Sequence, residues 1–448
     1  MSFDIKYQKN KLVLEELECE CGLKHRQPDM DIYIGPGILA NSVEYIEEAI
    51  TGERVLVITD NVVDDYAQEF IEIIENEGYD VKLCRLERKE ELVPDQRALG
   101  EILLALEPDI DFLCAVGSGS LNDLTRYIAF NTDRPFVSVG TAPSMDGYTS
   151  VIAPLIYNEL KVNKPAQNPE VLICDLDIMK KAPYEMLISG FGDVIGKYIS
   201  LADWKLGKIV NGEQYCPAAA EITMQAVNKC VDNVEGIIER TEKGIRSLIE
   251  ALILAGLTIL IIDNTRAVSS IEHGMGHYLE MMKLLRGEKP ARHGITVGVM
   301  TGYAVRIYED FLNLDLEKVA LEEIKAQRKT RAEWEQQVRD KYGARLGPSI
   351  LEKNSAGHLS WTEQKRRIET VCKNFAQIKQ EVDFLPSLKE LISLYRKLEF
   401  PLSAKEININ DQLMKDALLY GKDYRERYTV FKTMDELGVL EKYVAEIY

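Results

Sequence analysis

The sequence predicts an α/β domain built on a parallel sheet, followed by an all-α domain. Through the first part of the chain, short apolar segments alternate with amphipathic segments of helical period, which is typical of βαβ units. After Tyr184 almost only helix-period sequence remains. The chain has 448 residues, of which 46% are hydrophobic and 28% charged, so we expect two globular domains. We place them at residues 1–180 and 181–448.

Six short segments have the composition of buried parallel strands, being mostly apolar and rich in β-branched residues. They are Ile32–Ile34, Arg54–Thr59, Val81–Leu86, Phe112–Val116, Phe136–Val139 and Val171–Asp175. The amphipathic helices expected between them are Val62–Asn76, Asp95–Leu106 and Leu121–Asn131. Ligands of such sheets bind beyond the carboxyl ends of the strands, and that is where the polar loops of this chain fall.

Two of these loops have the chemistry of a dinucleotide site. Asp60 ends a strand, where a carboxylate can accept hydrogen bonds from a ribose diol and would repel a 2′-phosphate; it could equally cap the following helix. The second loop consists of Gly117, Ser118, Gly119, Ser120, Leu121, Asn122 and Asp123. Its glycines let the backbone approach a pyrophosphate at a helix N-terminus. The run is not a GxGxxG fingerprint, so a tight βα turn remains the alternative.

A third polar loop, Thr141–Ser150, follows the strand Phe136–Val139. It carries the hydroxyls of Thr141, Ser144 and Ser150 and the carboxylate of Asp146 around a proline and a glycine. An ordinary turn would use some of the same residues. The density of hydrogen-bonding groups at the end of a strand favours a binding loop.

The second half of the chain predicts a series of helices. They are Pro217–Glu239, Glu242–Ile262, Ala267–Leu285 and Ile295–Tyr308, with a charge-dense helix or helix pair over 316–346 and breaks at Pro386 and Pro401. The most apolar stretch, Leu248–Ile262, contains a glutamate and is shorter than the roughly 20 residues of a membrane span. We therefore expect a helix in the core of the helical domain and no membrane span.

Three of the five histidines, His273, His277 and His293, fall within 23 positions. The first two are four residues apart and share one face of a helix. Imidazole is the commonest protein ligand of transition metals, so the cluster predicts a metal site, although satisfied core or surface histidines are the alternative. Asp193, four residues before Lys197, is the candidate carboxylate that completes a ligand set for zinc, iron or nickel; a salt-bridged helix surface is the other interpretation.

Composition limits the partners and the compartment. The net charge of -19 argues against a general nucleic-acid binder. Eight scattered cysteines do not look like a disulfide framework, and the first residues contain no apolar core of signal-peptide length. We therefore expect a reducing cytoplasm. Cys19 and Cys21, with His25 close by, are weak evidence for a second metal site because no distant cysteine pair accompanies them, and we predict none there.

Several motifs occur together in the order found in one superfamily. They are GSGSLND, TAPSMDGYTS, SGFGDVIGK, the run Glu272–His277 and Arg292-His293-Gly294. In these motifs the chain resembles the iron-containing alcohol dehydrogenase, glycerol dehydrogenase and dehydroquinate synthase-like superfamily, over about residues 15–310. The loop TAPSMDGYTS and the segment Cys19–His25 resemble most closely its sn-glycerol-1-phosphate dehydrogenase branch, in the longer bacterial form.

The resemblance assigns roles to residues of this chain. Asp193, His273 and His293 match the metal ligands, while His277 and Asp146 match the catalytic residues on the side of the substrate, dihydroxyacetone phosphate. The residues that match the dinucleotide site are Asp60, Gly117, Ser118, Gly119, Ser120, Leu121, Asn122, Asp123, Thr141, Ser144 and Ser150. The implied reaction is the reversible, NAD(H)-linked reduction of that substrate to sn-glycerol 1-phosphate; a glycerol or other polyol dehydrogenase is the alternative.

One position departs from the alcohol dehydrogenases of the superfamily. They often carry a histidine four residues after the ligand aspartate, where this chain has Lys197. A cation there favours the glycerol phosphate branch, with Lys197, Arg292 or a helix N-terminus holding the phosphate. The resemblance further implies one divalent metal, zinc or nickel rather than iron, and NAD as cofactor, with NADP possible. It also implies a homodimer or a larger homo-oligomer.

Overall fold

The computed structural model describes residues 6–13, 19–26 and 28–447. Within it the chain forms two compact units, each made of two segments. The first unit comprises Met1–Val194 and Ala218–Asn264, and the second comprises Ile195–Pro217 and Thr265–Tyr448. The predicted limits, 1–180 and 181–448, describe two consecutive pieces, whereas these units interleave along the chain.

The first unit contains an eight-stranded sheet in the order β1-β2-β3-β10-β7-β6-β4-β5. Its strands are β1 (Lys6–Gln8), β2 (Lys11–Val13), β3 (Asp31–Gly35), β4 (Arg54–Asp60), β5 (Asp80–Leu86), β6 (Phe112–Gly117), β7 (Phe136–Gly140) and β10 (Val171–Asp175). The last six are parallel, and β1 and β2 add an antiparallel edge. All six predicted strands are therefore present, and the parallel sheet is confirmed.

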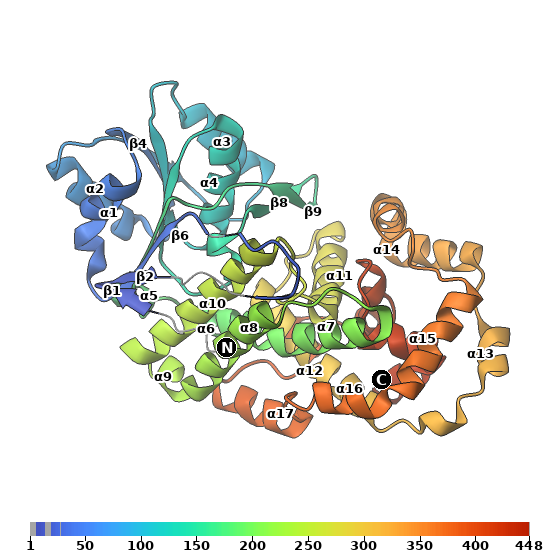
Figure 1. Ribbon diagram of the computed structural model, residues 1–448. Helices are drawn as coiled ribbons and strands as arrows, with labels where there is room; N and C mark the ends of the chain where they lie inside the picture. Colours follow the sequence, from blue (N-terminus) through green and yellow to red (C-terminus); the bar gives the residue numbers. More distant parts are fainter. Residues whose placement is uncertain (1–5, 14–18, 27, 448) are drawn as a thin grey trace. The chain divides into compact units, whose positions relative to one another are not determined.

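The strand order reverses between β4 and β6. After β4 the chain continues outwards to β5 and then returns to β6 on the other side of β4. The helix after β4, α2 (Asp64–Asn76), packs with Val55 and Val57 on one face of the sheet. The helix after β6, α4 (Gly119–Thr132), packs with Leu56 and Ile58 on the other face, as the helices on either side of the sheet in Figure 1 show. The carboxyl ends of β4 and β6 therefore lie at the topological switch point, where ligands bind in such sheets.

The first unit contains further helices besides α2 and α4. They are η1 (Ile38–Asn41), α1 (Ser42–Ala49), α3 (Gln96–Ala105), η2 (Asp146–Thr149), α5 (Leu176–Met179) and α6 (Tyr184–Ile195, of which the last residue belongs to the second unit). A separate hairpin pairs β8 (Ile152–Tyr157) with β9 (Leu160–Pro165). Its turn residues Asn158 and Glu159 have positive φ, a conformation that usually calls for glycine at the second position. Because a glutamate stands there instead, the sequence pattern did not reveal the hairpin.

Three later helices also belong largely to the first unit, namely α8 (Pro217–Asp232), α9 (Val234–Ile238) and α10 (Glu242–Ile262). Helix α10 is long and apolar enough to cross a membrane, but 89% of its most apolar window is buried inside the protein, as in a core helix. Our assignment of this segment to the core of an all-α domain was wrong. It lies against η2, where a Cβ on Gly256 would stand only 2.6 Å from the carbonyl oxygen of Asp146.

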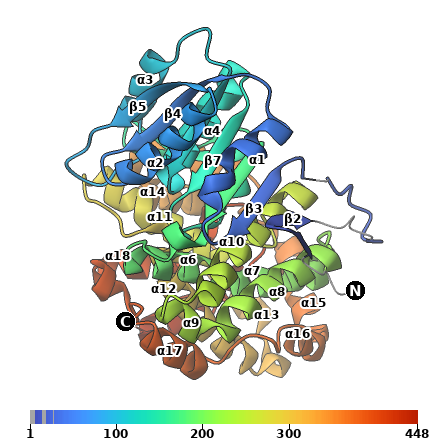
Figure 2. The same ribbon diagram turned by 90° about the vertical axis from the view of Figure 1, so that its left-hand side faces the viewer.

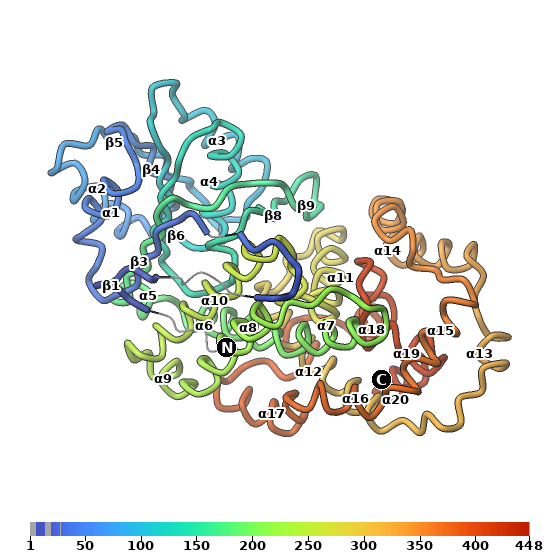
Figure 3. The backbone as a smooth tube through the Cα atoms, viewed as in Figure 1, coloured from blue at the N-terminus to red at the C-terminus, as the bar shows by residue number. Residues whose placement is uncertain are grey.

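In the described residues of the second unit, helices joined by loops are the only regular secondary structure (Figure 2). Its helices are α7 (Lys197–Asn211), α11 (Ile271–Leu285), α12 (His293–Leu312), η3 (Leu316–Lys318), α13 (Leu321–Gln327), α14 (Arg331–Lys353), α15 (Trp361–Lys373), α16 (Phe375–Glu381), α17 (Leu388–Lys397), η4 (Ala404–Ile407), α18 (Asp411–Tyr420), η5 (Gly421–Asp423), α19 (Val430–Glu436) and α20 (Leu440–Ile447). Helices α11 and α12 pack against each other and against α7, and the last helices, α18 to α20, lead to the C-terminus (Figure 3).

Replacing Gly256 with alanine should destabilise the first unit. The added methyl group meets the backbone of η2, which cannot move without displacing its loop, so we expect the free energy of unfolding to fall by about 1–3 kcal/mol in urea denaturation. Gly100→Ala is the matched control, because nothing lies within 4 Å of a Cβ in α3, and it should be neutral or slightly stabilising. Equal effects of the two substitutions would contradict the close contact.

Candidate functional site

Three of the predicted nucleotide-binding loops begin at one edge of the sheet in the first unit. Strands β4, β6 and β7 are parallel neighbours, and Gly117 is the direct partner of Gly140, after which the loop Thr141–Ser150 begins. Asp60 ends β4 on the other side of β6. The fold therefore brings these predicted segments to the same edge of the sheet, at the switch point between β4 and β6.

The loop from Gly117 to Asp123 runs directly into α4. The helix begins at Gly119, and no side chain caps its first amides. The side chain of Asn122 is buried, with neither its oxygen nor its nitrogen hydrogen-bonded. Unsatisfied buried amides are costly, so a group placed here by a ligand would restore the missing hydrogen bonds.

Asp60 uses one carboxylate oxygen for the chain itself. Its Oδ1 accepts hydrogen bonds from the amides of Val62 (2.8 Å) and Val63 (3.2 Å), just before α2. Both interpretations of this residue therefore retain support: it turns the chain into the helix, and it stands at the strand end where a ribose diol binds in related folds.

The loop Thr141–Ser150 is held by a buried arginine that the sequence did not single out. Arg126, on α4, donates hydrogen bonds to the carbonyl oxygens of Ser150 (2.8 Å), Gly147 and Ile152. Its guanidinium is fully buried, and the burial lowers its pKa. Because carbonyl acceptors carry no sequence signature, only the three-dimensional arrangement identifies Arg126 as the residue that positions this loop.

Asp123, one turn before Arg126, is a second buried charge in the same place. Burial raises the pKa of its carboxyl group to about 7, the nearby Asp146 raises it further, and the cation of Arg126 opposes the shift. A carboxyl group with such a pKa changes charge near neutral pH, which is characteristic of functional sites.

Asp146 and Asp193 are linked within the first unit. The backbone amide of Asp146, at the start of η2, donates a hydrogen bond of 3.1 Å to Oδ2 of Asp193. Asp193 is fully buried on α6, which passes so close to the loop that a Cβ on Gly190 would overlap the carbonyl oxygen of Pro143. The glycines of SGFGD therefore let this helix approach the loop.

The three clustered histidines lie together in the second unit. His273 and His277 are on α11, and His293 is the first residue of α12. The ring centroids of His273 and His293 are 5.3 Å apart, and those of His277 and His293 are 5.2 Å apart and stacked. The predicted convergence of these side chains is therefore present.

Two glutamates orient the histidine rings. Nδ1 of His273 lies 2.7 Å from Oε1 of Glu272, and Nδ1 of His293 lies 2.7 Å from Oε1 of Glu280. The other oxygen of Glu280 lies 3.4 Å from Nδ1 of His277. With Nδ1 protonated toward a carboxylate, Nε2 presents its lone pair to a metal, as in carboxylate–histidine–metal sites. We did not predict either glutamate, although Glu280 is three residues after His277 on the same helix.

Cations from the C-terminal part of the chain lie beside these histidines. A pocket of about 10 Å³, the size of one water molecule, is lined by His273, His277, Lys422, Arg425 and Arg427, among others. Backbone contact between Gly274 and Gly421 brings η5 this close to α11. Burial lowers the pKa of Arg427 to about 9, and the neighbouring Arg425 adds to the effect by repulsion. An anion in this place would relieve that repulsion.

Lys197 is the remaining predicted substrate residue. It is the first residue of α7 in the second unit, and its side chain is fully buried. A buried ammonium is costly without an anionic neighbour, which is consistent with a role near a negatively charged group.

The chain is similar to known dehydrogenases. A family model described as iron-containing alcohol dehydrogenase matches residues 33–183. The structure of a probable glycerol dehydrogenase from Sinorhizobium meliloti 1021 covers 95% of this chain and is itself fully covered, with a TM-score of 0.62 at 17% identity. This likeness shows the fold and confirms the predicted fold class, an α/β domain with a parallel sheet followed by a helical domain.

Sequence relatives identify the family more closely. Glycerol-1-phosphate dehydrogenase (NAD(P)+) of Bacillus licheniformis is 30% identical over 425 residues, which are 94% of this chain and 93% of the relative. The enzyme of the same name from Geobacillus stearothermophilus is 28% identical over 94% of this chain and 97% of its own length. The chain belongs to the glycerol-1-phosphate dehydrogenase family and is an oxidoreductase.

The raised pKa of Asp123 predicts a pH-dependent stability. Between about pH 4 and 7 the folded chain keeps a proton on Asp123 that the unfolded chain has released, so this group's contribution to the free energy of unfolding falls as the pH rises. Asp123→Asn should therefore remove this decrease. The measurement is urea denaturation of both proteins at about pH 5 and about pH 8.

Asp133→Asn, at the exposed C-terminal end of the same helix, is the control and should keep the pH dependence of the unmodified protein. If Asp123→Asn showed the same pH dependence as well, Asp123 would not carry the titration.

Proposed function

We propose that this chain catalyses the reversible reduction of dihydroxyacetone phosphate by NADH and a proton, giving sn-glycerol 1-phosphate and NAD+. Family membership supports the reaction class. The single observation that carries the site assignment is the Glu280 carboxylate, which faces Nδ1 of both His293 and His277. That arrangement prepares one imidazole to hold a metal and the other to move a proton.

The proposed metal ligands are Asp193, His273 and His293. Their donor set, one carboxylate and two imidazoles, fits zinc or nickel better than calcium or magnesium. The fit rests on His273 and His293, because their Nδ1 atoms face Glu272 and Glu280, which favours the tautomer whose Nε2 carries the lone pair that a metal binds. A divalent metal, when bound, polarises the substrate carbonyl as a Lewis acid.

His277 is the proposed proton donor and acceptor for the C2 oxygen. Its Nδ1 lies 3.4 Å from Glu280, so a proton that leaves Nε2 can be replaced while the ring stays oriented by the carboxylate. Asp146 would orient the substrate hydroxyl groups. Its own amide is fixed on Asp193, which holds the start of η2 in one place.

The proposed dinucleotide site comprises Asp60, the loop Gly117–Asp123, and Thr141, Ser144 and Ser150. The uncapped N-terminus of α4 and the unsatisfied amide of Asn122 support a ligand at this point. Asp60 favours NAD over NADP, because its carboxylate would repel a 2′-phosphate. The cofactor, when bound, would supply the hydride, and the loop Thr141–Ser150, which Arg126 holds in place, would bind its nicotinamide.

The phosphate of the substrate distinguishes the proposed reaction from that of a polyol dehydrogenase. Arg425 and Arg427 lie beside His273 and His277, and their mutual repulsion would be relieved by an anion. Lys197 is the further cation proposed for this role. A phosphorylated substrate would add an anion beside these cations and an unphosphorylated polyol would not, so the cations favour a phosphorylated substrate.

The proposed location of the protein is the cytoplasm. None of the eight cysteines takes part in a disulfide, which fits the reducing cytoplasm that we expect. A homodimer or larger homo-oligomer remains a prediction.

Glu280→Gln should weaken metal binding without removing a ligand. The amide cannot accept the Nδ1 proton with the strength of a carboxylate, and loss of such a partner typically lowers metal affinity about 10–100-fold. The measurement is the chelator concentration that removes half of the dehydrogenase activity. Glu288→Gln, an exposed residue in the turn after α11, is the control. Equal chelator sensitivity of both variants would contradict the orienting role.

The proposed substrate is tested by NADH oxidation with dihydroxyacetone phosphate and with unphosphorylated dihydroxyacetone. Metal-stripped protein is restored with zinc, nickel or iron in turn, and the product is analysed for chirality. We expect activity with zinc or nickel and a strong preference for the phosphorylated substrate. Absence of activity with dihydroxyacetone phosphate under every metal would refute the proposed function.

Arg425→Met should act on the phosphorylated substrate alone. Loss of one charge-assisted contact corresponds to about a 10–100-fold fall in kcat/KM for dihydroxyacetone phosphate, with little change for dihydroxyacetone. Arg396→Met, exposed on α17, is the control and should change neither value. An equal loss with both substrates would show that Arg425 does not bind the phosphate.

A further inference from the structure

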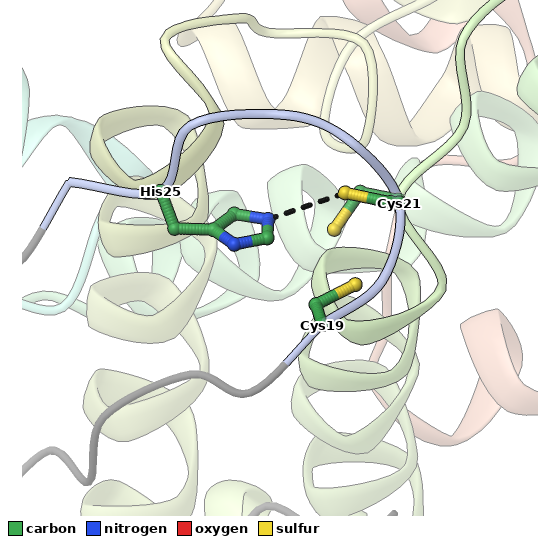
Figure 4. A group of neighbouring side chains, drawn as sticks. Cys19, Cys21 and His25 are labelled. Carbon is green, nitrogen blue, oxygen red and sulfur yellow. Dashed lines mark hydrogen bonds between the residues drawn. The ribbon is translucent and has the colours of Figure 1, made fainter.

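A second group of metal-binding side chains lies in the first unit, in the segment Cys19–His25. The sulfur atoms of Cys19 and Cys21 and a ring nitrogen of His25 lie within 4.8 Å of one another. Sγ of Cys21 is 3.4 Å from Nε2 of His25. Figure 4 shows both thiols and the imidazole facing the same space. The sequence alone gave weak evidence here, because it showed only one cysteine pair.

The distance between Cys21 and His25 is close to an edge of a zinc tetrahedron. Zinc binds thiolate sulfur at about 2.3 Å and imidazole nitrogen at about 2.0–2.1 Å, so ligands at tetrahedral angles are separated by roughly 3.6–3.8 Å. The 3.4 Å between Cys21 and His25 is close to this value, so that a metal could enter with little movement of the chain.

The local backbone fixes the direction of the Cys21 side chain. Gly22 has φ 76°, which turns the chain back, and the amide of Leu23 then donates a hydrogen bond of 3.4 Å to Sγ of Cys21. This contact holds the sulfur on the side where His25 lies. All three side chains are half-buried, so the group is sheltered yet within reach of an ion.

The segment is also attached to the core of its unit. The amide of Arg26 donates a hydrogen bond of 3.0 Å to the carbonyl oxygen of Ile261, near the end of α10. From there the chain continues to β3 in the sheet. A metal at Cys19–His25 would therefore hold the chain before β3 against the unit that carries the nucleotide-binding loops.

We propose that Cys19, Cys21 and His25 bind a zinc ion as a structural centre, separate from the catalytic metal. Binding releases the two thiol protons to solvent, and no electrons are transferred. The fourth position is filled by water or by a residue outside this segment. A disulfide between Cys19 and Cys21 is the competing chemistry, and the test below distinguishes the two.

Cobalt(II) substitution separates the two centres, because thiolate ligands give a charge-transfer absorption that carboxylate and imidazole ligands lack. We expect the unmodified protein to bind two equivalents of cobalt per chain and to show this band. His273→Ala should lose one equivalent and keep the band. Cys21→Ser should lose one equivalent together with the band, whereas the control Cys372→Ser, another half-buried cysteine, should keep both.

His25→Cys distinguishes the loss of a metal ligand from the loss of the fold. It replaces one metal ligand with another, so it should keep the second equivalent and strengthen the charge-transfer band. The proposal would be overturned by the absence of the band in the unmodified protein, by its persistence in Cys21→Ser, or by a mass that shows a Cys19–Cys21 disulfide in protein purified under reducing conditions. None of these outcomes depends on the dehydrogenase reaction, so this proposal can fail without the proposed function failing.

Discussion

The arrangement of His277 and His293 depends on a single carboxylate, that of Glu280. It is buried on α11, three residues after His277, and its two oxygens face His277 and His293. Because one oxygen is 2.7 Å from its imidazole and the other is 3.4 Å away, the two rings are not held equally. The tighter contact fixes the proposed ligand, and the looser one leaves the proposed proton carrier freer to change its protonation state. The two roles predicted from sequence resemblance thus acquire a physical basis in a residue that the resemblance did not include.

The start of α11 is held by a second buried network in the same unit. Arg266 pairs with Glu213 and donates to Ser270, whose hydroxyl group donates to Asp203. Burial raises the pKa of Asp203 to about 6, while its hydrogen bonds act in the opposite direction. Because Arg266 and Asp203 also bond to residues 428 and 430, the last part of the chain is tied to the segment that precedes His273. The C-terminal part of the chain therefore holds the start of α11 in position and places Lys422, Arg425 and Arg427 beside it.

The sequence predicted the features that are encoded locally. Apolar strands such as Arg54–Asp60 and the i, i+4 spacing of His273 and His277 are properties of short segments, and both are present in the structure. Arg126 and Arg425 could not be found in this way. The first bonds to backbone carbonyls, which any residue supplies, and the second reaches the histidines from some 150 positions away through a contact between two glycine backbones. The grouping of α10 with the sheet was missed for a similar reason, since burial alone does not identify the partner of a helix.

The loops proposed to bind the dinucleotide contain groups that cost stability in the absence of a ligand. Asn122 has an unsatisfied amide, Asp123 is buried with a raised pKa, and Arg126 is a fully buried cation. Each would be replaced at a gain in stability if packing were the only requirement, because apolar residues of similar size avoid the desolvation penalty. Their concentration where β6 enters α4 is consistent with a polar ligand that would supply partners for Asn122 and Asp123. In this respect the unsatisfied groups support the proposed cofactor site independently of the strand order.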